Sequence, residues 1–288
     1  MRQAHLGYGL SKLPSRKLAA TRSVYATAGL ASTPPALDRL VRRNLTYTAG
    51  YYQRAARLVD QRYRRTLQRT IAVRGVDRLE AATSGSRGAI LVAAHLGDFD
   101  LAGSWIAEVF GRSPVVPVAA VSSAARQDFY DRVRRACGFT LRRQGDTTVN
   151  DLATDIRRGR LVIIMLDRQP TGRTIDLDLF GRPATVSAAP HALSAMTGAP
   201  VLSAATWNVD RRRRVLSFGD PHAIAPSADP AGGPSPLHHA VRDLERAVLS
   251  APHQWHVPAD RSQLPWRPDL PSSGRWESCP WHVRSNLR

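Results

Sequence analysis

Three residues of one short stretch combine types and spacing that suit acid–base chemistry: His95, Asp98 and Asp100. A carboxylate that hydrogen-bonds one ring nitrogen of a histidine fixes its tautomer and leaves the other nitrogen free as a general base. The spacing favours Asp100 as the partner of His95, because Asp98 is placed to cap a following helix. A histidine near an aspartate is also common as an ordinary surface or core pair, so the neighbouring elements must decide between these interpretations.

The elements around this stretch place His95 at the end of a strand. Residues 90–94 are all apolar, which is typical of a strand covered on both faces. Gly97 permits a turn, and apolar residues then recur at helical spacing over residues 101–110. Because open α/β sheets bind ligands beyond the carboxyl ends of their strands, the position of His95 favours a functional role.

A second apolar strand, residues 161–166, ends at Asp167 and Arg168. Asp167 at this position is expected either to line a cleft or to cap the loop that follows. Residues 36–70 show a helical pattern, whereas residues 1–35 look weakly ordered. Residues 257–288 form a Pro- and Trp-rich tail that we expect to be extended or disordered.

The chain is strongly basic, with a formal net charge of +18 over 288 residues. Only Lys12 and Lys17 are lysines, so nearly all of this charge comes from arginine. A charge of this size indicates an anionic partner, either nucleic acid or anionic lipid and phosphate-bearing substrate. No nucleic-acid-binding motif accompanies it, so we expect no nucleic acid partner.

The predicted helices of residues 36–70 carry many arginines and several tyrosines. They form either a solvated basic face or a helix pair on an anionic membrane surface, with the tyrosines at headgroup depth. No stretch has the length of a transmembrane span, and two cysteines fit a reducing compartment. We therefore expect a cytoplasmic protein that is peripheral on the inner face of the cell membrane.

Over residues 38–256 the chain resembles the lysophospholipid acyltransferase superfamily, and within it the branch of lipid A and phosphatidylinositol mannoside acyltransferases. The resemblance rests on a series of motifs that occur in the expected order: His95-Leu-Gly-Asp-Phe-Asp100, Arg132 and Arg134 ahead of Gly138, Asp167-Arg-Gln169 with Phe180-Gly-Arg-Pro-Ala-Thr185, Gly198-Ala-Pro200, and Pro252-His-Gln-Trp255. Asp100 and Asp98 stand where this branch commonly has Glu and Asn.

This resemblance implies a single α/β domain, residues 36–256, with a mixed central sheet flanked by helices and preceded by an N-terminal helical segment. It implies transfer of a fatty acyl chain from a thioester donor, acyl-CoA or acyl carrier protein, to a hydroxyl or amine of a glycolipid-like acceptor. His95 and Asp100 would form the catalytic dyad, and no metal or cofactor is expected. Arg132, Arg134 and Arg168 are candidates for binding phosphates of the substrates, and Asp167 for lining the cleft.

Two other classes of protein compete with this interpretation. A basic protein that binds nucleic acid or a membrane surface without catalysis would explain the charge, but it leaves the motifs at the strand ends unexplained. A serine or cysteine hydrolase is disfavoured, because no Gly-x-Ser-x-Gly motif occurs and Cys137 has no evident partner.

Overall fold

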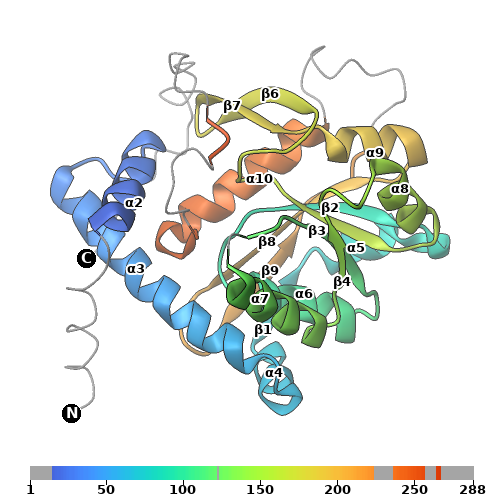
Figure 1. The fold of residues 1–288 in the computed structure, drawn as a ribbon, viewed down its shortest axis with the longest axis horizontal. Coiled ribbons are helices and arrows are strands. Elements are labelled where there is room, and N and C mark those ends of the chain that lie inside the picture. The colour runs from blue at the N-terminus through green and yellow to red at the C-terminus, as the bar shows by residue number, and fades with distance from the viewer. Residues whose placement is uncertain (1–14, 122, 224–235, 257–263, 267–288) are drawn as a thin grey trace.

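A seven-stranded mixed sheet forms the centre of the computed structural model, which describes residues 15–121, 123–223, 236–256 and 264–266 (Figure 1). The strand order is β1-β9-β8-β2-β5-β3-β4, and every pair is parallel except β8 with β9. The strands are β1 (Ile71–Arg74), β2 (Ala89–Ala93), β3 (Pro114–Val118), β4 (Thr140–Arg143), β5 (Leu161–Met165), β8 (Val201–Asn208) and β9 (Arg214–Phe218). The α/β class with a mixed central sheet, implied by the family resemblance, is confirmed.

The two central strands, β2 and β5, are covered on both faces. Ile90 and Val92 of β2 belong to one hydrophobic core, whereas Ala89 and Leu91 belong to the core on the opposite face. This double burial explains why the strand is a continuous apolar run rather than an alternating one.

Helices cover both faces of the sheet. Three of them contribute to one core or lie against it: α8 (Val149–Arg157), α9 (Ala189–Thr197) and α10 (Pro236–Ser250). The other face carries α5 (Val76–Ala82) and α6 (Phe99–Glu108), with α7 (Ala124–Ala136) beside α6. The connection after β2 therefore leaves through α6 on one face, and the connection after β5 leads to α9 on the other. A change of side between neighbouring strands is where open α/β sheets form their binding crevice.

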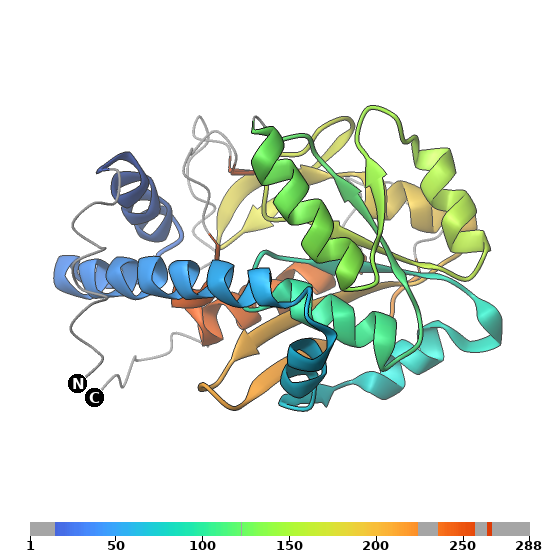
Figure 2. The same cartoon turned by 60° about the horizontal axis from the view of Figure 1, so that its bottom comes forward.

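The N-terminal helices pack against the end of this α/β unit (Figure 2). They are α2 (Ser15–Thr27), α3 (Pro34–Arg57) and α4 (Gln61–Gln68), and the last two confirm the predicted helical segment. The expectation of weak order was wrong for α2, because Val24 and Tyr25 are buried in the main core and the Tyr25 hydroxyl donates to the carbonyl of Pro252 at 2.7 Å. Residues 1–14 lie outside the described residues.

A hairpin and two 3-10 turns are the remaining elements of the described residues. The hairpin of β6 (Thr174–Leu179) and β7 (Arg182–Ser187) follows β5, and the 3-10 turns are η1 (Ser84–Ser86) and η2 (Pro252–Gln254). Of the predicted tail, residues 264–266 are described, and Trp266 donates from Nε1 to the Leu179 carbonyl at 3.1 Å. Residues 257–263 and 267–288 lie outside the described residues. Within the described residues, every helix is too short or too polar to cross a bilayer.

Candidate active site

His95 and Asp167 meet at the carboxyl end of the central strands. The ring Nδ1 of His95 lies 2.7 Å from Oδ1 of Asp167, and the main-chain N–H of His95 donates to Oδ2 at 3.0 Å. The carboxylate is almost fully buried, at 6% exposed, while 21% of the His95 side chain is exposed. The pair thus combines a shielded carboxylate with a histidine that solutes can reach.

The register between β2 and β5 brings these two residues together. Ala93 and Met165 are paired at the ends of the two parallel strands, and His95 and Asp167 each follow two residues later. The N–H of Leu166 donates to the Ala93 carbonyl at 2.9 Å, so the strands still run together beyond this pair. The sequence shows that the two clearest apolar runs each end in a polar residue. It does not show that these two runs pair with each other, and so it does not predict the contact between His95 and Asp167.

Two other side chains besides His95 hold the Asp167 carboxylate in place. The indole Nε1 of Trp255 donates to its Oδ2 at 2.8 Å, and Nη1 of Arg168 donates to the same oxygen at 3.2 Å. Although burial alone would raise the pKa of Asp167, the contacts with His95, Arg168 and Trp255 hold that pKa well below its ordinary value. Asp167 is therefore an anion in the folded protein at neutral pH.

The pKa of His95 is lowered, chiefly by burial, and the nearby Arg168 and Arg134 lower it further against the opposing effect of Asp167. The imidazole is thus neutral at neutral pH. Because the Asp167 carboxylate can only accept, Nδ1 carries the proton and Nε2 bears the lone pair. Among the described residues Nε2 has no hydrogen-bond partner, so it is free to accept a proton from a bound substrate.

Asp100 forms no hydrogen bond with His95 in the structure, and the predicted bond between them is corrected. Its Oδ2 accepts from the Tyr51 hydroxyl at 2.6 Å, and Nε of Arg134 lies 3.6 Å from Oδ1. The first turn of α6 points this carboxylate toward α3 and α7, and the ring nitrogen it was expected to hold is bonded to Asp167. Whether Asp100 takes part in catalysis stays a prediction.

Asp98 occupies the N-cap position of α6, but its side chain makes no capping hydrogen bond, which corrects the predicted role. Instead its carboxylate accepts from Nη2 of Arg54 at 2.8 Å and from Nε of Arg214 at 3.1 Å. Tyr47 and Asn208 complete the network at 3.2 and 3.1 Å. This buried network ties α3 and β9 to the turn that carries His95.

Gly97 makes the turn itself possible. Its φ is +64°, in the left-handed region, and a Cβ at this position would lie 2.4 Å from the carbonyl oxygen of Thr206 in β8. A side chain would force the turn away from the sheet.

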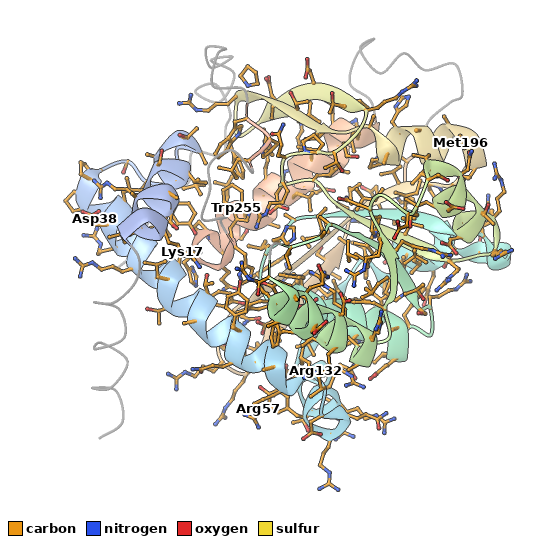
Figure 3. All side chains as sticks on the ribbon, in the orientation of Figure 1. Lys17, Asp38, Arg57, Arg132, Met196 and Trp255 are labelled. Atoms are coloured by element: carbon orange, nitrogen blue, oxygen red, sulfur yellow. The ribbon has the colours of Figure 1, made fainter. Side chains whose placement is uncertain are left out.

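The three arginines predicted to bind substrate phosphates lie in different surroundings. Arg134 faces the site from α7, with its guanidinium 5.4 Å from the ring centre of Tyr130. Arg168 donates to Asp167 and to the carbonyl of His256. Arg132 is exposed on α7, and no hydrogen bond or ion pair joins it to the described residues, whereas Trp255 lies in the interior (Figure 3).

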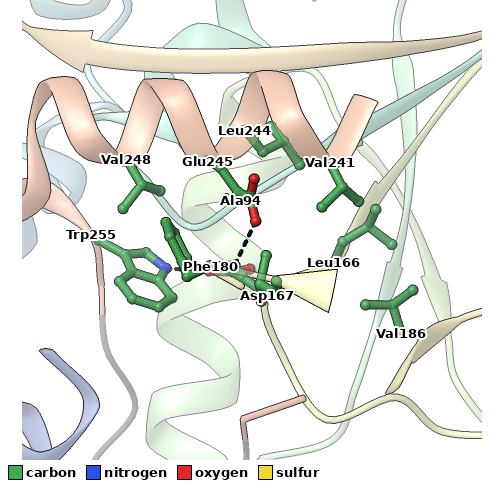
Figure 4. A pocket seen from close by; sticks show the side chains of 11 residues that line it. Ala94, Leu166, Asp167, Phe180, Val186, Val241, Leu244, Glu245, Val248 and Trp255 are labelled. Atoms are coloured by element: carbon green, nitrogen blue, oxygen red, sulfur yellow. Dashed lines mark hydrogen bonds between the residues drawn. The ribbon is translucent and has the colours of Figure 1, made fainter. Parts of the chain in front are cut away.

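Asp167 also lines an apolar cavity (Figure 4). The cavity is small: about 20 Å³ admits the centre of a water molecule, and the unfilled space reaches about 340 Å³ only when the open solvent at its mouth is included. Its walls come from the ends of β2 and β5, the β6–β7 hairpin, α10 and Trp255: Ala94, Leu166, Asp167, Leu179, Phe180, Val186, Val241, Leu244, Glu245, Val248 and Trp255. In the part of the chain that is described, no three His, Cys, Asp or Glu side chains converge as metal ligands would.

The sequence model of the bacterial lipid A biosynthesis acyltransferases matches residues 35–257, which include the whole central sheet, His95 and Asp167. The chain therefore belongs to this family, and it is an acyltransferase by that membership.

The chain is also similar to curated proteins named phosphatidylinositol mannoside acyltransferase from mycobacteria. It is 28% identical over 258 residues to the protein of Mycobacterium tuberculosis strain H37Rv, covering 86% of this chain and 77% of that protein. It is 26% identical over 255 residues to the protein of Mycolicibacterium smegmatis, covering 86% of this chain and 80% of that protein.

Proposed function

We propose that the protein transfers a fatty acyl chain from a thioester, acyl-CoA or acyl carrier protein, to a hydroxyl group of a glycolipid such as a phosphatidylinositol mannoside. An amine acceptor would use the same chemistry. The observation that carries the proposal is the His95–Asp167 hydrogen bond, which leaves Nε2 of a neutral imidazole free at the switch point of the sheet. The acceptor class comes from the names of the mycobacterial relatives.

In the proposed mechanism Nε2 of His95 takes the proton of the acceptor hydroxyl while its oxygen attacks the thioester carbonyl. The tetrahedral intermediate then collapses, the carbon–sulfur bond breaks, and the imidazolium returns the proton to the leaving thiolate. Asp167 fixes the ring tautomer and stabilises the imidazolium. General base catalysis of this kind contributes roughly 10²- to 10⁴-fold, so positioning and oxyanion stabilisation must supply the rest.

The cavity lined by Asp167 supports an apolar acyl group as the cargo. Nine of its eleven lining residues present apolar side chains, and Asp167 with its Trp255 partner forms the wall nearest the histidine. The N–H groups at the start of α6, which the Asp98 side chain leaves uncapped, and the Arg168 cation are candidates for stabilising the oxyanion.

Arg134 and Arg168 are the arginines that the geometry favours for substrate phosphates, because both influence the ionisation of His95 while keeping part of their side chains exposed, 19% and 25%. Arg132 is exposed elsewhere on α7 and is a weaker candidate. The proposed roles of Arg134 and Arg168 are to hold a phosphate of the donor or of the glycolipid acceptor.

We further propose that the enzyme works at the cytoplasmic membrane surface, with α3 and α4 facing anionic lipid. Their outward side presents exposed arginines: Arg39, Arg42, Arg43, Arg57, Arg62, Arg65 and Arg69. The tyrosines contribute less to this membrane-facing surface than the sequence led us to expect. Tyr51 is 4% exposed and packs inward, whereas Tyr52 is 40% exposed.

The test is an acyl transfer assay with purified protein, palmitoyl-CoA and a panel of glycolipid acceptors, read by mass spectrometry of the products. We expect acylated phosphatidylinositol mannoside from the wild type and almost none from His95→Ala. His239→Ala serves as control, because this histidine is exposed on α10 and stacks on His222 instead. Wild-type turnover by His95→Ala would contradict the mechanism.

Sedimentation with vesicles tests the membrane proposal separately. Binding to phosphatidylglycerol vesicles should weaken in the double variant Arg42→Glu/Arg43→Glu and persist in the matched control Arg211→Glu/Arg212→Glu, which changes an exposed turn of the sheet. Equal weakening in both variants would indicate a response to total charge rather than to this face. Steeply salt-dependent DNA binding without thioester turnover would instead favour the non-catalytic rival.

A further inference from the structure

A second imidazole, that of His256, lies against the turn that carries His95. It follows Trp255 and is 9% exposed. Its ring packs on Tyr51, with ring centres 4.3 Å apart, and its centre lies 5.5 Å from that of Phe99. The Phe99 ring also contacts His95, at 5.3 Å between centres. The two imidazoles therefore pack against the same phenyl ring.

The main chain of His256 is tied to both halves of the proposed site. Its N–H donates to the carbonyl of His95 at 2.8 Å, and its own carbonyl accepts from Nη2 of Arg168. A second hydrogen bond joins the same two segments: the N–H of Gly97 donates to the carbonyl of Gln254 at 3.1 Å. The segment after η2 thus forms a short antiparallel bridge with the His95 turn while holding the residue that follows Asp167.

The side chain of His256 adds a hydrogen bond that its main chain cannot make. Nε2 lies 2.9 Å from the carbonyl oxygen of Gly97, and because a carbonyl only accepts, Nε2 carries the proton. Burial lowers the pKa of His256 to about 4, so the ring is neutral at neutral pH. Gly97 holds a left-handed φ, and this bond fixes its peptide plane directly after His95 and Leu96.

We infer that His256 is a positioning residue for His95: its ring N–H holds the Gly97 carbonyl, and with it the turn that aims the His95 imidazole at Asp167 and the substrate. This inference rests on the proposed function for its kinetic consequence. The inference also gives an indirect role to Asp100, the carboxylate of the His95-x4-Asp100 motif. Asp100 accepts a hydrogen bond from the hydroxyl of Tyr51, and the Tyr51 ring packs on His256. Asp100 would then act on the His95 turn through Tyr51 and His256.

Two substitutions separate the hydrogen bond from the bulk of the ring. His256→Gln keeps an N–H donor at a similar reach, and His256→Leu keeps volume without a donor. We expect kcat to fall about 10- to 100-fold in the Leu variant with KM within twofold, because small displacements of a catalytic group cost rate rather than binding. The Gln variant should stay within about threefold of the wild type.

The matched control is His253→Leu, three residues earlier in the same segment, where the ring lies against Tyr47, while the Gly97 carbonyl is bonded by His256. Its kcat should equal that of the wild type. A wild-type kcat in His256→Leu, or an equal loss in the Gln and Leu variants, would overturn the inference. If circular dichroism shows that the Leu variant is unfolded, His256→Asn, which is polar but too short to reach Gly97, makes the same comparison.

An NMR titration of the His95 ring distinguishes failure of this inference from failure of the proposed function. The His95 resonances and pKa should shift in His256→Leu and stay at wild-type values in His256→Gln and His253→Leu, whether or not any acyl acceptor is turned over. Unchanged His95 signals in His256→Leu would refute the positioning role. Absence of acyl transfer by the wild type would refute the proposed function alone.

Discussion

The ring of His95 and the carboxylate of Asp167 are joined by a 2.7 Å hydrogen bond across two neighbouring parallel strands, 72 residues apart in sequence. The carboxylate also accepts from the indole of Trp255, in the segment that follows the last helix. Three distant parts of the chain therefore define the orientation of one imidazole. This arrangement distinguishes the roles of the two candidate carboxylates, Asp167 and Asp100.

Asp167→Asn should lower kcat by about 10²- to 10⁴-fold with little change in KM, because an amide can donate to Nδ1 and favour the wrong tautomer of His95. Steady-state kinetics with acyl-CoA would measure this. Asp100→Asn is the comparison, and its loss should be smaller, since its carboxylate bonds Tyr51 rather than the imidazole. A larger loss in Asp100→Asn than in Asp167→Asn would restore Asp100 as the partner of His95.

The pH dependence of kcat/KM should reflect the lowered pKa of His95. A general base works in its neutral form, so activity should persist as the pH falls through 6.5, the ordinary value, and decline only below it. The sign for stability agrees: a histidine whose folded pKa is lowered contributes stability that is present above 6.5 and lost as the pH falls through the folded pKa. An acid limb of the rate profile above pH 6.5 would contradict this assignment.

Removing the Asp98 carboxylate should cost far more than a lost helix cap. Asp98→Ala would leave Arg214, whose side chain is 5% exposed, without its anionic partner, and breaking such a buried pair costs about 3 to 5 kcal/mol. Chemical denaturation would measure the free energy of unfolding. Asp38→Ala is the control, because its pair with Arg22 is exposed and should contribute under about 1 kcal/mol. Equal effects of the two substitutions would contradict the buried network.

Glu245 should destabilise the protein at neutral pH. Burial in the apolar cavity raises its pKa from the ordinary 4.5 to about 6, although it accepts from the Phe180 N–H at 2.5 Å. Stability from the neutral carboxyl is fully present below pH 4.5 and lost as the pH rises through about 6. Glu245→Gln should therefore stabilise the protein above pH 6 by up to about 2 kcal/mol.

Thermal unfolding at pH 4.5 and pH 8 would check this prediction, with the wild type as reference. The gap between Glu245→Gln and the wild type should widen toward pH 8. A gap that is the same at both pH values would show that ionisation of Glu245 is not its cause.

Arg134 and Arg132 form a matched pair on α7. Arg134→Ala should lower kcat/KM about 10- to 100-fold, in line with loss of a charge-assisted contact of 1.5 to 3 kcal/mol to a substrate phosphate. Arg132→Ala should stay within twofold, because this side chain is exposed and forms no hydrogen bond or ion pair with the described residues. The reverse order of effects would place the phosphate on the outer side of α7.

Much of the architecture followed from local sequence pattern. The apolar runs at β2 and β5 and the helical periodicities around them predicted elements that the structure confirms, because burial on two faces or on one imposes a characteristic spacing. The local sequence around His95 also predicted that this residue lies at the end of a strand, as the structure confirms. Order in α2 was missed, since Val24 and Tyr25 become core residues only by packing on a segment near the other end of the sequence.

The sequence alone therefore determined the family, most of the helices and strands along the chain, and the placement of His95 at the carboxyl end of a strand. Only the tertiary structure decided which carboxylate meets its ring. Spacing along the chain favoured Asp100, five residues away, but the first turn of α6 directs that side chain toward Tyr51. Asp167 reaches His95 instead because β2 and β5 pair in register, and strand register depends on the contacts of the whole sheet rather than on either strand by itself.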